Sequence, residues 1–84
     1  MKLPIIRHIV KDSVKQDIES AIKVLEIYSE APGVTEEEYN LLAEMISNLS
    51  GAIEVKALIE QGVLEKDAAN QFMRKVMSSI DRLN

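Results

Sequence analysis

The sequence contains no cysteine and only one histidine, His8. The first absence excludes a disulfide framework and a thiolate zinc site, and the second excludes a cluster of histidine ligands. A domain of 84 residues buries only about 60–65% of its unfolded surface and is therefore marginally stable by itself. Because neither disulfides nor such a metal site can stabilise this chain, we expect oligomerisation to supply the extra stability.

Aromatic residues, glycine and proline are also scarce. Tryptophan is absent, and the chain has two tyrosines, one phenylalanine, three glycines and two prolines. A β-sandwich or barrel would need more aromatic and β-branched residues and more turn signals. The composition therefore predicts an all-α protein, a small antiparallel bundle of three main helices with a short N-terminal helix or arm, in one domain over residues 1–84.

No apolar run approaches the roughly 20 residues of a membrane-spanning helix, and the start "MKLPIIRHIV" lacks the apolar length and cleavage site of a signal peptide. The net charge of −4 is unevenly placed, since residues 24–67 hold ten acidic and two basic side chains. Such an acidic middle disfavours binding to a phosphate backbone. We therefore expect a cytoplasmic protein that binds neither membranes nor nucleic acid.

Local signals in the first third of the chain predict two helices. Pro4 can begin a short helix over about residues 4–10, although the β-branched residues there equally permit an extended arm. Ser13 and Gln16 have the spacing of a capping box, in which two orphan amides at a helix start are satisfied reciprocally. This pair predicts a second helix over about residues 14–30.

The remaining two helices also have local signals at their ends. Thr35 and Glu38 form a second candidate capping box, which predicts the start of a long helix over about residues 36–61. Gly62 can adopt the left-handed conformation that ends such a helix. A last helix is predicted over about residues 65–82, and the short connections favour antiparallel packing of neighbours.

The centre of the long helix, "MISNLSGAIEV", is rich in poor helix formers. Gly51 costs about 1 kcal/mol relative to Ala in a helix interior, and Ser or Asn costs roughly half as much. Small side chains also let two helix backbones approach closely. One alternative is a break in the helix, with Ser50 capping a second helix that begins at Gly51.

Apolar residues of the long helix fall into two rows that are offset by one position, roughly 100° around the helix. One row suffices for packing within the chain, so the second row predicts a self-association surface. Asn48 interrupts this second row, and a lone Asn in an apolar seam specifies register and oligomer state. The alternative is that the row packs on the last helix of the same chain, with Asn48 part-exposed. The candidate interface residues are Leu41, Met45, Asn48, Gly51, Ala52, Val55 and Ile59.

Candidate chemistry is sparse. Arg7, His8 and Lys11 form a candidate anion patch, and His8 is the only side chain expected to titrate near neutral pH. No nucleophile motif, metal-ligand spacing or phosphate-binding glycine loop accompanies them, so we expect no catalytic, metal or cofactor site.

Two catalytic or binding alternatives have weak support. A mutase-like helical enzyme would aim several cations into the bundle, where this chain offers only Arg7, Arg74 and Arg82 near helix ends. A helix-turn-helix nucleic-acid binder would expose polar side chains early in the last helix, where Asn70 and Gln71 lie beside repelling carboxylates.

The stretches "KLPIIRHIV", "EAPGVTEEE" and "SNLSGAIEV" together resemble a small family of bacterial all-helical proteins of similar length with no assigned activity. The resemblance transfers no catalytic residues. It implies gene neighbours of the thioredoxin and peroxiredoxin type, and hence an adaptor or regulator that binds such enzymes without exchanging electrons itself. The leading hypothesis is a non-catalytic module that self-associates through its long central helix, with a dimer favoured, and an adaptor or regulator of another cytosolic protein is the alternative.

Overall fold

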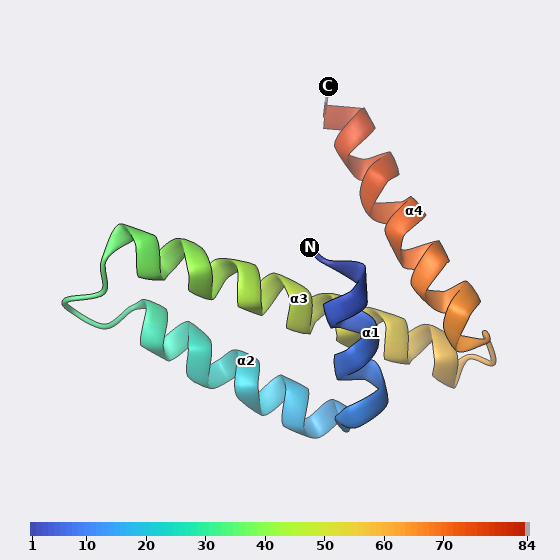
Figure 1. Cartoon of the computed structure of the whole chain (residues 1–84), viewed down its shortest axis with the longest axis horizontal. Coiled ribbons are helices and arrows are strands. Elements are labelled where there is room, and N and C mark those ends of the chain that lie inside the picture. The colour runs from blue at the N-terminus through green and yellow to red at the C-terminus, as the bar shows by residue number, and fades with distance from the viewer. Residues whose placement is uncertain (84) are drawn as a thin grey trace.

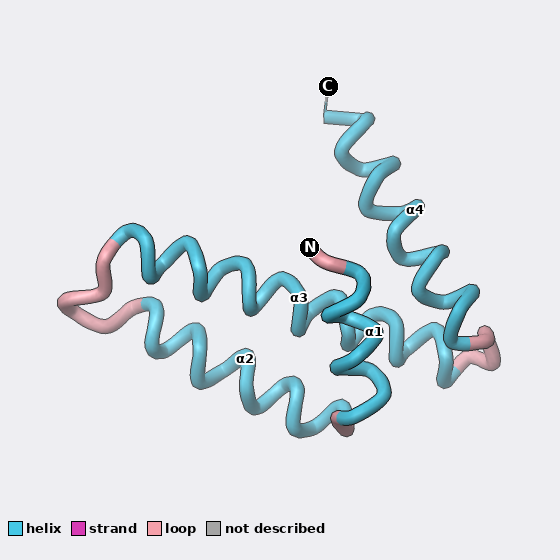
Figure 2. Tube along the Cα trace, viewed as in Figure 1, coloured by secondary structure: helices cyan, strands magenta, loops and turns pink. Residues whose placement is uncertain are grey.

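The computed structural model describes the backbone of residues 1–83 and the side chains of residues 1–78. The chain forms four helices, α1 (Leu3–Asp12), α2 (Lys15–Ser29), α3 (Glu36–Glu60) and α4 (Glu65–Leu83). Figure 2 shows helices joined by short loops and no strand in this described part. The predicted all-α class, with helices packed in a bundle-like arrangement and a short N-terminal helix, is confirmed, and α1 is a helix rather than an extended arm. The side chain of Arg82 lies outside the described residues.

α2 and α3 form an antiparallel hairpin, which is the longest layer of the molecule (Figure 1). The turn between them passes through Gly33, whose φ of +92° suits a residue without a Cβ. The capping box predicted at the start of α3 is confirmed. The Glu38 N–H donates to Thr35 Oγ1 over 3.2 Å, and the Thr35 N–H donates to Glu38 Oε1 over 3.1 Å.

The capping box predicted for α2 is wrong. α2 begins at Lys15, its N-cap is Val14, and no side chain caps it. Ser13 instead ends α1, where its N–H donates to the Ile9 carbonyl over 3.0 Å. The physical reason is that α1 continues to Asp12, so only two extended residues remain to turn the chain and Ser13 is needed at the earlier helix end.

The end of α3 follows the prediction made from Gly62, which has φ of +98°. The Gly62 N–H donates to the Ile59 carbonyl over 2.9 Å, and the Val63 N–H donates to the Leu58 carbonyl over 3.1 Å. These two bonds are the pattern of a Schellman motif. α4 then runs back from this turn but diverges from α3 rather than lying along it (Figure 1). In the described residues, α2 and α4 do not pack against each other.

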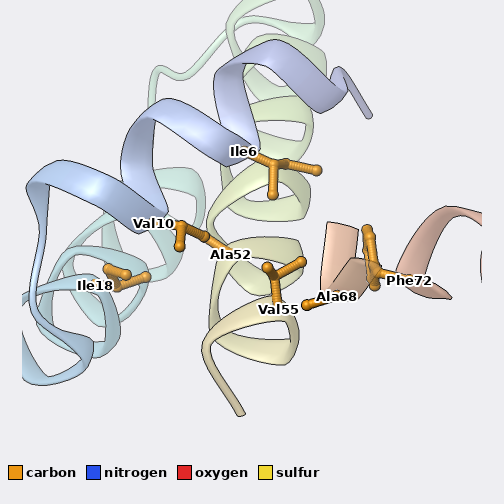
Figure 3. Close-up of a cluster of buried hydrophobic side chains, with 7 residues drawn as sticks. All are labelled: Ile6, Val10, Ile18, Ala52, Val55, Ala68 and Phe72. Atoms are coloured by element: carbon orange, nitrogen blue, oxygen red, sulfur yellow. The ribbon is translucent and has the colours of Figure 1, made fainter. Parts of the chain in front are cut away.

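The core lies at one end of the hairpin, where α1 crosses α3 and where α4 begins. Figure 3 shows side chains from all four helices meeting there. The buried apolar cluster consists of Ile6 and Val10 from α1, Ile18 from α2, Ala52 and Val55 from α3, and Ala68 and Phe72 from α4. The far half of the hairpin, near Gly33, has no third helix over it (Figure 1).

The resulting molecule is thin and extended. Its principal extents are 43 × 35 × 17 Å, so its thickness is less than two helix diameters of about 10–12 Å. The radius of gyration is 13.9 Å, whereas a compact chain of this length has about 12 Å. None of the helices in the described residues combines the length and apolarity needed to cross a membrane.

Candidate interaction surface

Asn48, the polar residue in the second row of α3, is buried within the chain and only 5% exposed. Its Oδ1 accepts a hydrogen bond of 2.9 Å from the backbone N–H of Lys2, the N-cap residue of α1. Glu38 accepts the same kind of bond from the N-cap amide of α3. Asn48 therefore supplies, from another helix, a cap that no side chain of α1 provides.

Gly51 is also buried, at the place where two helices cross α3. A Cβ on Gly51 would lie 3.0 Å from Ile6 Cδ1 of α1 and 3.0 Å from Phe72 Cζ of α4. The small residue thus permits a close approach within one chain. α3 is continuous through this point, so the alternative of a helix break at Ser50 is wrong.

These contacts correct part of the predicted interface. Asn48, Gly51, Ala52 and Val55 are buried by α1 and α4 of the same chain and therefore have no free surface for a second copy. The alternative prediction was that this row packs on the last helix of the same chain and that Asn48 is part-exposed. The structure shows that α1 covers the row as well and that Asn48 is buried. Ile59 is half-buried against the core, so only two predicted interface residues, Leu41 and Met45, are exposed.

The exposed pair extends the flank of α3 on which α1 lies. α3 faces α2 through Leu42, Ile46, Leu49 and Ile53. The residue directly before each of these lies about 100° around the helix from the side that faces α2. Asn48 and Ala52 occupy such positions and contact α1. Leu41 and Met45 occupy the equivalent positions further back along α3, so they continue the same flank past α1. The N-cap residue of α1, Lys2, reaches as far as Glu44, whose Oε1 lies 3.8 Å from Lys2 Nζ.

α2 contributes to this flank as well. Two antiparallel helices are related by a two-fold axis perpendicular to their common plane, so corresponding positions on both helices lie on the same side of the pair. Leu25 and Ser29 are the half-buried inward positions of α2 in the far half of the hairpin, and Val24 and Tyr28 precede them. The exposed fractions are 63% for Val24, 53% for Tyr28, 59% for Leu41 and 42% for Met45. We call these four residues the open face.

The opposite flank of the hairpin has a different composition. There the residues that follow the inward positions are charged, polar or small. They are Glu19, Lys23, Glu26 and Glu30 on α2, and Ala43, Ser47, Ser50 and Glu54 on α3. The open face therefore groups four exposed large apolar side chains on one side of the hairpin, while Ile27 (70% exposed) and Tyr39 (53% exposed) lie outside it. A group of exposed apolar side chains of this kind is typical of an interaction site.

The end of the hairpin that carries the open face is negatively charged. Residues 24–45 include six glutamates and no lysine or arginine. Two of these, Glu26 and Glu30, lie on the opposite flank, and Glu44 Oε1 lies 3.8 Å from Lys2 Nζ. Another of the six, Glu38, has a pKa below its ordinary 4.5, because the backbone N–H of Thr35 and then the Thr35 hydroxyl donate to its carboxylate. It is therefore a fixed negative charge at neutral pH. A partner for this end of the hairpin should carry apolar side chains and positive charge.

The predicted anion patch does come together on one face of α1. Arg7, His8 and Lys11 are all exposed and line a shallow depression with Pro4. Arg7 Nε lies 3.8 Å from Glu65 Oε1, and His8 Nε2 lies 3.4 Å from Asp12 Oδ2. Carboxylates thus already neighbour two of the three basic groups. In the described residues, no three His, Asp or Glu side chains are grouped so as to hold a metal ion.

A cleft between the diverging helices was not predicted from the sequence. It has a volume of about 520 Å³ and lies between the second half of α3 and α4. An exposed ion pair bridges it, with Lys75 Nζ 3.7 Å from Glu54 Oε1. Its lining is Glu54, Ala57, Leu58, Gln61, Gln71, Phe72, Arg74 and Lys75. This mixed lining offers hydrogen bonds and one apolar wall but no focused set of catalytic groups.

Val24 and Tyr28 of α2 were not among the predicted interface residues. The available signal was the width of the apolar face of α2, which exceeds what packing on one neighbour requires. The residues that form the open face therefore come from both hairpin helices, whereas the interface predicted from the sequence contained residues of α3 alone.

Comparison with known proteins gives a family and no activity. A family of unknown function, DUF6952, matches residues 1–81. No curated protein and no solved structure matches the chain.

Proposed function

The chain belongs to this family of unknown function, and we propose that it is a cytoplasmic, non-catalytic helical module that works by self-association, with a dimer as its functional state. The observation that carries the proposal is the open face, where four large apolar side chains of the hairpin are exposed on one flank. The other exposed large apolar side chains of the hairpin, Ile27 and Tyr39, do not belong to this group. Apolar side chains that are grouped on one flank indicate an interaction surface more strongly than scattered ones.

The exposed area supports the same proposal. The chain exposes 6089 Å², whereas a compact protein of 9.4 kDa exposes about 5,000 Å². The excess of about 1,000 Å² is close to the roughly 800 Å² that each partner buries in an interface of standard size. A dimer would therefore bring this chain to the surface area that its mass predicts.

Light scattering coupled to size exclusion tests the proposal directly. Over a series of loading concentrations, we expect a mass about twice the chain mass of 9.4 kDa, with dissociation only on dilution. A mass equal to one chain at high micromolar concentration would contradict self-association. It would favour the alternative from the sequence, in which the open face binds a different cytosolic protein as an adaptor or regulator.

A further inference from the structure

α4 carries two methionines that lead from the edge of the core onto its diverging half. Met73 and Met77 are four residues apart and so share a face of the helix. Met73 is half-buried beside the core, and Met77 is 58% exposed. Together with Asn70, Arg74 and Ser78 they line an open depression on the diverging half of α4. Methionine side chains are flexible and adapt to irregular apolar surfaces, which suits a contact with another helix layer.

One basic residue of α4, Arg74, complements the negative end of the hairpin. Arg74 is exposed and lines the same depression as Met73 and Met77. Lys75 is two positions from each methionine, so it lies on the other side of α4, where its Nζ is 3.7 Å from Glu54 Oε1. The far half of the hairpin, residues 22–45, has six glutamates and one lysine, Lys23. Opposite charges of this kind steer association and fix the register of two surfaces.

The α4 of the same chain does not cover the open face. It packs on α3 beside Gly51 and then diverges from α3 (Figure 1). It does not pack against α2 in the described residues, and Leu41 and Met45 stay exposed. The two complementary surfaces of one chain therefore lie apart, which leaves a second copy to bring them together.

We propose that the open face of each copy is covered by α4 of a second copy, with Met73 and Met77 lying on Val24, Tyr28, Leu41 and Met45. This inference rests on the proposed self-association and adds the surface that performs it. In a two-fold dimer the contact occurs twice, since each chain gives its α4 and receives the α4 of the other. Arg74, which follows Met73 directly, then lies against the glutamate-rich end of the partner hairpin, whereas Lys75 lies on the other side of α4 beside Glu54 of its own chain.

The absence of cysteine makes cross-linking a clean test. Met45→Cys and Met77→Cys would be prepared as separate single variants, mixed, allowed to exchange, and treated with a short bis-maleimide cross-linker. We expect a covalent dimer that contains one chain of each variant. The control mixture pairs Met77→Cys with Ala43→Cys, which places the thiol at an exposed position of the opposite flank of α3.

Circular dichroism of each variant would first establish that it is folded, and light scattering would establish its mass. A dimeric mass with 45–77 cross-linking no greater than 43–77 cross-linking would overturn this inference and leave the proposed self-association standing. A monomeric mass for the wild-type chain would overturn both. Preferential 45–77 cross-linking between chains would support both.

Discussion

Asn48 and Gly51 illustrate, at the scale of single residues, why an unfavourable helix sequence can stabilise a fold. Both weaken the intrinsic helix propensity of α3. Asn48 caps α1 through the Lys2 amide, and Gly51 makes room for Ile6 and Phe72. Their local cost is offset by contacts between elements, which propensity does not describe. The weak stretch is therefore the point where three helices meet within one chain.

The hydrogen bond of Asn48 makes a quantitative prediction. Asn48→Ala should lower the free energy of unfolding by about 1–2 kcal/mol, because α1 loses a cap and the part-buried Lys2 N–H loses its acceptor. Urea unfolding at one fixed protein concentration measures the change. Asn40→Ala, at an exposed position of the same helix, is the control and should stay within about 0.5 kcal/mol. Equal losses in the two variants would show that the Lys2–Asn48 bond contributes nothing.

Gly51 tests the close helix crossing. Gly51→Ala should gain up to about 1 kcal/mol of helix propensity but lose about 1–3 kcal/mol to overpacking, since its Cβ would lie 3.0 Å from buried atoms of two other helices. We expect a net loss of stability, measured by urea unfolding. Ile6→Val removes the Cδ1 atom that the new methyl group meets, so the loss should be smaller in that background. A more stable Gly51→Ala protein would contradict the close approach.

At the scale of elements, the end of a helix could be predicted from the sequence where the residues that form it are close together in the chain. The Thr35–Glu38 box and the Gly62 turn give the ends of α3 because each uses residues within one turn. Ser13 misled the prediction because the same local pattern also suits the end of α1. The role of α1 could not be predicted, because its contact with Asn48 spans 46 positions along the chain.

The capping box of α3 also has a pH dependence. The pKa of Glu38 is lower in the folded chain than its ordinary 4.5, so its contribution to stability is complete above about pH 4.5. That contribution is lost as the pH falls through the folded pKa. Thr35→Ala removes the hydroxyl donor and keeps the backbone donor, so the Glu38 pKa should rise part of the way, as measured by NMR titration.

Thr35→Ser is the matched control for this titration, because it keeps a hydroxyl group at the same place. It should retain the low Glu38 pKa, and its unfolding free energy should show the same acid dependence as the wild type. An unchanged Glu38 pKa in Thr35→Ala would mean that the hydroxyl bond seen at 2.9 Å is not maintained in solution.

At the scale of the whole molecule, the sequence predicts self-association but does not locate the exposed surface that would serve it. Length and the lack of cysteine already suggested oligomerisation. The location of the free surface depends on how far α1 reaches along the hairpin, and α1 stops before Leu41 and Met45. The second row of α3 is therefore divided between the core and the open face. Helical spacing shows which residues share the row but not which of them another helix covers.

The central claim is that the chain self-associates through its open face. The most direct test is the solution mass of a variant with a charge placed on that face. Leu41→Asp and Ala43→Asp introduce the same side chain into α3 two positions apart, on opposite flanks of the hairpin. Sedimentation equilibrium should give a dimer for the wild type and for Ala43→Asp, and a monomer for Leu41→Asp, because a desolvated carboxylate would lie in the contact. A dimer for Leu41→Asp as stable as that of Ala43→Asp would contradict the account.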